Sequence, residues 1–103
     1  MTLRIRATPE AEADINAAYI WYEQAGAGLA ERFASAFRDT LLEVAKRPAA
    51  SRVVHEGLRR ALIQRFPYTV FYVQDDRDIV IIGCFHARRD PKAWRIRGRE
   101  YGE

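Results

Sequence analysis

The stretch from Ile79 to Arg97 reads IVIIGCFHARRDPKAWRIR, and the rest of the chain is best understood around it. Its first half is an unbroken apolar run rich in β-branched residues, which is typical of a buried strand. Its second half, from His86 onward, is strongly cationic and contains Trp94. A buried strand that leads into such a segment predicts a polar surface at one rim of a sheet, and we take this stretch as the first candidate for a functional site.

The composition indicates a small globular protein. The chain has 103 residues, of which 49% are apolar and 30% charged, so we expect one domain over residues 1–103 with its own hydrophobic core. Cys84 is the only cysteine, and a small buried side chain is the better interpretation of it than a reactive thiol. Neither a signal peptide nor a membrane-spanning run is recognisable, which predicts a cytoplasmic protein without a membrane partner.

Positive charge is concentrated in the second half of the chain. Residues 1–51 contain six Lys and Arg against seven Asp and Glu, whereas residues 52–103 contain eleven against seven. Six cations and one acid lie between residues 88 and 99. This asymmetry predicts an acidic partner, either a nucleic acid or an acidic protein segment.

Two helices are predicted in the first half of the chain. Thr8 is a suitable N-cap and Pro9 suits the first helical position, and apolar residues then recur at helical spacing as far as residue 25. Gly26 ends this helix. A second amphipathic pattern runs from Leu29 to Pro48. Because the link between the two is short, we expect an antiparallel helical hairpin.

Four strands are predicted, over residues 3–8, 58–66, 68–73 and 79–86. The last is apolar on both faces and is expected at a central position. Residues 48–57 are interpreted as a surface loop, residues 92–97 as one possible helical turn, and the chain from about residue 97 as loosely held. The order β-α-α-β-β-β predicts an α+β fold in which an antiparallel helical hairpin packs on one face of a mostly antiparallel sheet.

The polar candidates cluster near the ends of the last strands. His86 is a candidate general base or hydrogen-bond donor, although a lone histidine is more often structural. Arg65, Arg88 and Arg89 are able to converge on a phosphate or carboxylate, with a solvated cationic rim as the alternative. Trp94 either stacks on a partner or folds back as a plug over the sheet, and the plug is favoured. Neither a metal-binding spacing nor a cofactor-binding loop is present in the sequence, so no cofactor is expected.

Three segments resemble the RelE/ParE toxin superfamily. They read PEAEADI at 9–15, GLRR at 57–60 followed by RFPYTVFY at 65–72, and FHARRDP at 85–91. The resemblance covers nearly the whole chain and implies a toxin of a type II toxin–antitoxin module, neutralised by a small antitoxin. RelE-like members cut mRNA on the ribosome, whereas ParE-like members block DNA gyrase and are not themselves enzymes.

Residue by residue, the resemblance favours the ParE branch. Tyr68 occupies the position at which nuclease members commonly carry an arginine, and Ala87 follows His86 where some of them have a tyrosine. RNA cleavage through the 2′-hydroxyl needs a base, an acid and charge stabilisation. The sequence offers His86 and arginines, but no evident second proton-transfer group.

The leading hypothesis is therefore a ParE-like toxin that inhibits gyrase. The first alternative is a ribosome-dependent mRNA endoribonuclease that uses Arg65, His86 and Arg88, and the second is a non-toxic plasmid-stabilisation domain that only binds an antitoxin. Because one helical hairpin covers one sheet face and strand edges stay unpaired, we expect an acidic, amphipathic antitoxin, with self-association also possible. The residues predicted to contact target or antitoxin are Arg60, Arg65, Tyr68, His86, Arg88, Arg89, Lys92, Trp94, Arg95 and Arg97.

Overall fold

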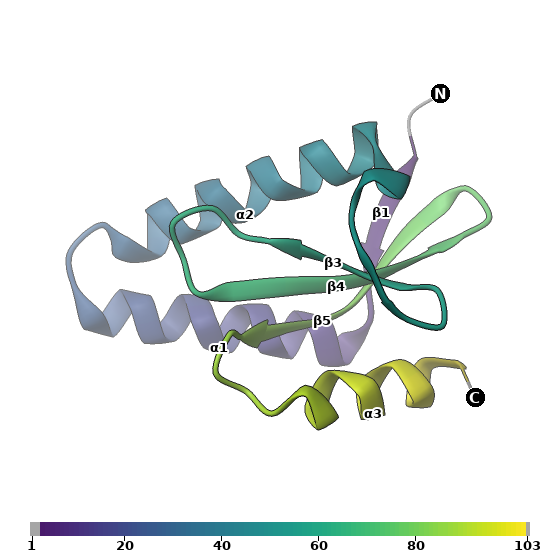
Figure 1. Cartoon of the computed structure of the whole chain (residues 1–103). Helices are drawn as coiled ribbons and strands as arrows, with labels where there is room; N and C mark the ends of the chain where they lie inside the picture. Colours follow the sequence, from purple (N-terminus) through teal and green to yellow (C-terminus); the bar gives the residue numbers. More distant parts are fainter. Residues whose placement is uncertain (1–2, 103) are drawn as a thin grey trace.

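The computed structural model describes residues 3–102, which form an α+β fold (Figure 1). In chain order the elements are β1 (Arg4–Ala7), α1 (Pro9–Ala25), α2 (Leu29–Lys46), the short 3₁₀ helix η1 (Pro48–Ala50), β2 (Val53–His55), β3 (Leu58–Leu62), β4 (Tyr68–Asp75), β5 (Asp78–His86) and α3 (Pro91–Gly102). The predicted helical hairpin is confirmed and the four predicted strands are present as β1, β3, β4 and β5, whereas β2 and the full helix α3 are additional to the prediction.

The five strands form one sheet in the order β1-β5-β4-β3-β2. The β1–β5 pair is parallel, and the pairs β5–β4, β4–β3 and β3–β2 are antiparallel, so the prediction of a mostly antiparallel sheet is confirmed. β5 has a strand on each side, and its residues from Ile79 to Phe85 are all buried. This agrees with the interior position that its continuous apolar run predicts.

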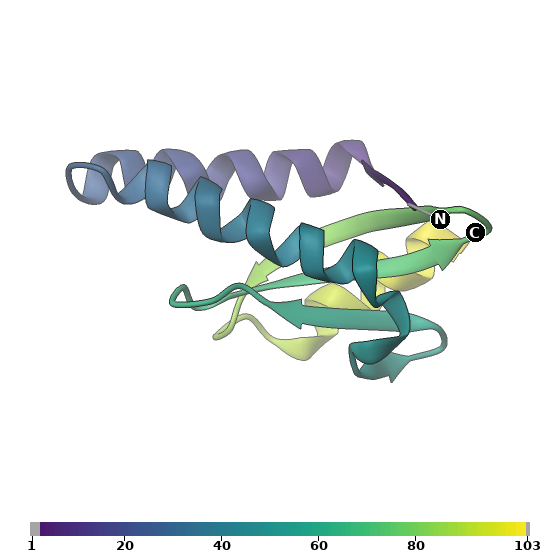
Figure 2. The same cartoon turned by 90° about the horizontal axis from the view of Figure 1, so that it is seen from above.

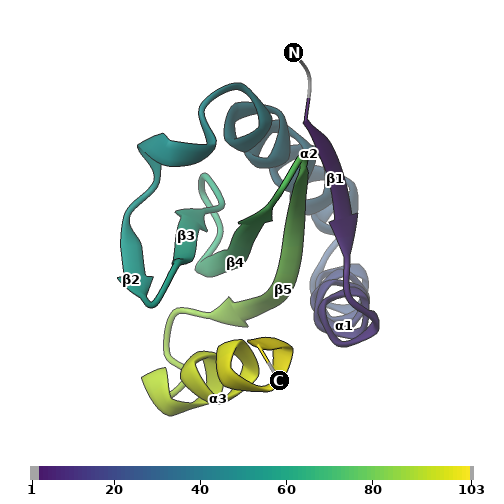
Figure 3. The same cartoon turned by 90° about the vertical axis from the view of Figure 1, so that its right-hand side faces the viewer.

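The helices cover both faces of the sheet. Figures 2 and 3 show α1 and α2 together on one face and α3 on the opposite face. On the first face the hairpin packs against residues that include Val70, Tyr72 and Ile81. On the second face α3 packs against Phe71, Ile82 and other apolar residues. Neighbouring residues of a strand thus contribute to two separate apolar layers, as the period of two requires.

The first helix begins as the sequence predicts. The Thr8 side-chain Oγ1 accepts a hydrogen bond from the Ala11 N–H at 3.1 Å, and Pro9 occupies the first turn, where a missing N–H costs nothing. The link to α2 passes through Gly28, whose φ of 75° lies in the left-handed region that glycine adopts without strain. This local chemistry fixes the antiparallel hairpin.

Three boundary predictions are wrong. Residues 48–57 are not a plain loop, because they contain η1 and the short strand β2, which pairs with β3. The strand predicted to reach Phe66 ends at Leu62, since a turn with Arg65 at φ 71° precedes Pro67. The segment from Arg97 onward is helical through Gly102, because α3 buries one side of itself on the sheet. The expectation that the hairpin leaves the second sheet face uncovered is therefore also wrong.

A β-bulge in β5 interrupts the regular pairing of this strand with β4. Phe71 is opposite Gly83 and Tyr72 is opposite Ile81, so Ile82 has no partner of its own in β4. A Cβ on Gly83 would lie 2.7 Å from a ring carbon of Phe85, which is itself 3% exposed. The bulge therefore needs a residue without a side chain at position 83.

We predict that Gly83→Ala lowers the free energy of unfolding by about 1–3 kcal/mol, because the buried Phe85 ring has to shift to make room. Equilibrium unfolding in urea measures the change. Gly102→Ala is the matched control, because a Cβ there meets no atom within 4 Å. Equal stability of the two variants would contradict the packing argument.

Candidate functional site

A wide groove lies between α2 and β3. Its volume is about 1120 Å³, roughly that of two turns of helix with their side chains. The apolar part of its lining is contributed by Leu29, Ala36, Val44, Ala50, Ala61, Leu62 and Phe66. Leu62, the last residue of β3, is 66% exposed, which leaves a large apolar side chain in contact with water. An apolar groove of this kind is a docking surface for an amphipathic segment.

Arginines surround the groove. Five of them line it, from α2, from the segment after it, from β3 and from the turn after β3: Arg32, Arg47, Arg52, Arg60 and Arg65. Asp39 and Glu43 are the acids of the lining. The excess of positive charge around an apolar floor favours an acidic, amphipathic occupant.

Part of the predicted contact surface assembles at one end of the sheet. Tyr68 begins β4 and pairs in register with His86 at the end of β5. The Ala87 N–H donates to the Pro67 carbonyl at 2.7 Å, which joins the turn before β4 to the turn after β5. Arg65 belongs to the first of these turns and Arg88 to the second, and both are exposed. The fold thus gathers candidates that lie about twenty residues apart in the sequence.

His86 is held by two contacts at this end. Its Nδ1 accepts a hydrogen bond from the Arg88 N–H at 3.0 Å, and its ring meets the Tyr68 ring edge-on with centroids 5.2 Å apart. An acceptor Nδ1 implies that the neutral ring carries its proton on Nε2. Burial raises the pKa of the Tyr68 hydroxyl, so this phenol stays protonated at neutral pH.

The other predicted contact residues lie elsewhere. Arg60 is half-buried in β3 opposite Phe71 and borders the groove. Lys92 and Arg95 are exposed on α3, which packs on the sheet face opposite the hairpin. Trp94 stacks on Phe71 with ring centroids 5.0 Å apart, so the favoured plug interpretation is confirmed. The single rim predicted from the sequence is therefore two surfaces, one on each side of the sheet.

Arg97 does not lie on an exposed rim, which corrects its assignment to the contact surface. Its Nη1 donates to Asp14 Oδ2 at 2.9 Å and to the Ile82 carbonyl at 3.0 Å, and its side chain is 21% exposed. Asp14 Oδ2 also accepts the Cys84 N–H at 3.0 Å. β1 pairs only with the first part of β5 and ends before Ile82. The side chains of Asp14 and Arg97 therefore occupy the hydrogen-bonding positions that a neighbouring strand would otherwise take. We call this arrangement the edge clasp.

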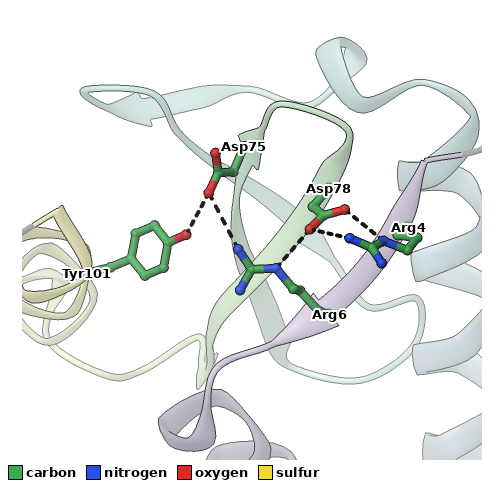
Figure 4. Close-up of polar contacts among 5 residues, drawn as sticks. All are labelled: Arg4, Arg6, Asp75, Asp78 and Tyr101. Carbon is green, nitrogen blue, oxygen red and sulfur yellow. Dashed lines mark hydrogen bonds and ion pairs between the residues drawn. The ribbon is translucent and has the colours of Figure 1, made fainter.

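A second polar network joins β1, the β4–β5 turn and the end of α3 (Figure 4). Asp78 accepts hydrogen bonds from Arg4 at 3.1 Å and Arg6 at 3.0 Å, and these bonds lower the pKa of its carboxyl group. Asp75 accepts from Arg6 and from the Tyr101 hydroxyl, each at 3.4 Å. Most of these groups are solvent-exposed, so the network orients α3 more than it stabilises the fold.

Cys84 is a structural residue. It is 3% exposed, and burial together with the nearby Asp14 carboxylate raises the pKa of its thiol to about 12. The thiolate that a nucleophile or metal ligand requires is therefore not formed at neutral pH. Within residues 3–102 there is also no group of His, Cys, Asp and Glu side chains placed to hold a metal ion. No helix in this range combines the length and apolar character needed to cross a membrane.

Sequence reasoning missed two sets of functional or structural residues. Asp14 was not singled out by sequence reasoning, and only its distance to Cys84 reveals its role. The groove residues Arg32, Arg47 and Arg52 lie in segments without a motif. No sequence signal marked them, because the groove becomes visible only when α2 and β3 lie side by side and Leu62 is seen to be exposed.

Comparison with known proteins identifies the family. The family model described as the ParE toxin of the type II toxin–antitoxin system parDE matches residues 5–91. The chain belongs to this ParE toxin family. It is accordingly a type II toxin of the RelE/ParE superfamily, as the resemblance implied. No curated protein matches the chain.

Solved structures share the fold of this ParE family member. A chain of the chromosomal ParDE toxin–antitoxin system from P. aeruginosa aligns with a TM-score of 0.61 and 21% identity, over 82% of this chain and 96% of that one. A chain of the toxin–antitoxin complex RelBE2 from Mycobacterium tuberculosis aligns with a TM-score of 0.61 and 19% identity, over 84% and 99%. Both likenesses concern the scaffold, which is common to the ParE and RelE branches.

We predict that Arg97→Met lowers the free energy of unfolding by about 2–3 kcal/mol, because it leaves the mostly buried Asp14 carboxylate and the Ile82 carbonyl without their donor. Urea unfolding is the measurement. Arg99→Met is the control on the same helix, since Arg99 is exposed, and it should change stability by no more than about 0.5 kcal/mol. If Arg97→Met lowered the free energy of unfolding by as little as the control, the edge clasp would not contribute to stability.

Proposed function

We propose that this ParE family member inhibits DNA gyrase and that a cognate antitoxin neutralises it by occupying the α2–β3 groove. The observation that carries the gyrase part is the match of a ParE family model over residues 5–91. The family is named for toxins of parDE systems, and ParE-like action on gyrase is what the resemblance implies. The groove part rests on the geometry of the chain itself.

The end of the sheet around His86 supports a docking role. The Nδ1 atom of His86 is engaged by a backbone N–H, and the adjacent Tyr68 hydroxyl has a raised pKa. A general acid–base pair works best when its pKa values lie near the operating pH, which a half-buried phenol with a raised pKa does not satisfy. Arg65 and Arg88, exposed in neighbouring turns, suit recognition of acidic groups.

One observation favours the endoribonuclease alternative. His86 and Tyr68 are in ring contact at 5.2 Å, and two exposed arginines lie in the turns beside them. On a ribosome-bound mRNA, the free Nε2 of His86 would be the proton-transfer atom and the arginines would stabilise the charged phosphorane. The two functions therefore differ in how strongly they depend on His86.

We predict that the purified toxin blocks supercoiling by DNA gyrase and leaves mRNA on translating ribosomes intact. His86→Ala should retain inhibition to within about tenfold, because a contact of roughly 1 kcal/mol is lost and not a reaction. His55→Ala, at the exposed residue 55 of β2, is the matched control. Cleavage of mRNA that His86→Ala abolishes, with gyrase unaffected, would establish the alternative.

The groove fits an antitoxin segment in shape and charge. Its volume accommodates roughly two helical turns, its floor is apolar and arginines outnumber acids in its lining. An amphipathic helix with acidic flanks would bury the exposed Leu62 and pair with the arginines. The outer edges of β1 and β2, the two edge strands, remain available for an added strand from the same partner.

We predict that Leu62→Glu weakens antitoxin binding at least tenfold, because it places a charge in the apolar floor and repels acidic flanks. Calorimetric titration with the cognate antitoxin measures it. Leu42→Glu is the matched control, because Leu42 is 54% exposed on α2 and does not line the groove. Affinity should also fall as salt rises. If both substitutions changed the affinity for the antitoxin equally, the antitoxin would not occupy the α2–β3 groove.

A further inference from the structure

The outward side of α3 and the turn before it carry a second cationic surface, separate from the groove. It consists of five exposed residues, which we call the α3 stripe: Arg88, Arg89, Lys92, Arg95 and Arg99. The inward side of the helix, including Trp94, Arg97 and Tyr101, packs on the sheet. Figure 3 shows α3 on the face of the sheet opposite the hairpin, with no other element outside it.

The stripe is not neutralised by the protein. Among residues 3–102, no ion pair within 4.0 Å involves any of its five cations, whereas Arg4, Arg6 and Arg97 all have carboxylate partners. Two acids lie beside the stripe in the sequence, Asp90 and Glu100. Asp90 accepts the Lys92 backbone N–H with its side chain and so acts as a local cap, and Glu100 is exposed on the last turn of α3. A set of unpaired cations on one side of a helix repels itself, which is a cost that a polyanionic partner removes.

Two of the guanidinium groups are held in place by aromatic rings. The Arg89 group lies 5.2 Å from the centroid of Phe85, and the Arg95 group lies 5.2 Å from the centroid of Trp94. Phe85 is buried and Trp94 is stacked on Phe71, so both platforms are rigid. Stacking reduces the conformational freedom that binding would otherwise remove, and it leaves the N–H groups available to an external acceptor.

The geometry points to a nucleic-acid phosphate backbone as the occupant of the α3 stripe. Lys92 and Arg99 are separated by about 10 Å along the helix axis, a length over which duplex DNA presents roughly six phosphates. Ile96 is the one large apolar residue exposed on this helix, at 48%, and a single side chain is a small apolar area for a protein partner to anchor on. The groove has several apolar lining residues, whereas the exposed residues around Ile96 on α3 are mostly cationic.

This inference adds to the proposed function that the toxin engages the DNA of its target complex directly. The charges and contacts of α3 carry the phosphate-binding part, and the choice of duplex DNA as the occupant rests on the proposed function, since gyrase acts on duplex DNA. Tighter binding of RNA than of duplex DNA would overturn this choice. Retained DNA binding without inhibition of gyrase would overturn the proposed function alone.

The test measures fluorescence anisotropy of the full chain with labelled short duplex DNA, duplex RNA and single-stranded RNA. We expect the duplex DNA to bind most tightly of the three, with a logarithmic salt dependence between about 50 and 200 mM salt whose slope reflects three to five contacts. The triple variant Lys92→Gln, Arg95→Gln and Arg99→Gln should lose at least tenfold in affinity at the lower salt, and the slope for duplex DNA should fall by about 2.7. Replacing both arginines by lysine should retain most of the affinity.

The matched control is the triple variant Arg38→Gln, Lys46→Gln and Arg77→Gln. It removes the same charge from exposed positions that do not belong to the α3 stripe and should bind as the wild type does. Unchanged unfolding midpoints verify that both triples are folded. Equal losses in the two triples would show that net charge alone is responsible, and no binding by the wild type would also overturn the proposal. Competition by polyglutamate as effective as by nucleic acid would replace the phosphate backbone with an acidic protein segment.

Discussion

The arrangement of the whole chain depends on how one edge of β5 is completed. β1 pairs with only the first part of β5, and the remaining edge exposes backbone groups that cannot be left unpaired in a protein interior. Asp14 from α1 accepts the Cys84 N–H, and Arg97 from α3 donates to the Ile82 carbonyl. The same two side chains pair with each other at 2.9 Å. One helix on each face of the sheet is thereby attached to the same strand.

The clasp also explains why the two cationic surfaces are separate. With α3 held against the second sheet face, the cations that follow His86 lie on the side opposite the hairpin. The arginines of the groove, including Arg52 and Arg65, gather on the side of α2. A chain with a net charge of +3 thus concentrates its positive charge on two surfaces. The first is the apolar groove between α2 and β3, and the second is the α3 stripe on the outer side of α3 and the turn before it. Because one is a groove and the other is a helix surface, they suit different partners.

Much of the fold was predictable because its signals are local. Thr8 and Pro9 start α1 through a hydrogen bond within one turn, and the apolar run of residues 79–86 requires a buried strand whatever surrounds it. β2 and the full length of α3 were not predictable, since β2 has three residues and α3 is apolar on one narrow side only. Of the candidate site, the sequence located His86 and the arginines near it but not their division between two surfaces.

The sequence by itself determined the helical hairpin, the four longer strands and the family resemblance, because each depends on residues close in the chain or on a pattern that many folds would bury in the same way. Only the tertiary structure decided the role of Arg97. In the sequence it is one of six cations between residues 88 and 99, and nothing local distinguishes it. Its inward direction is set by Asp14, 83 residues away, and by a carbonyl of β5 that lacks a neighbouring strand. Long-range pairing of this kind depends on which edge the sheet leaves open, and that edge exists only once the sheet has formed.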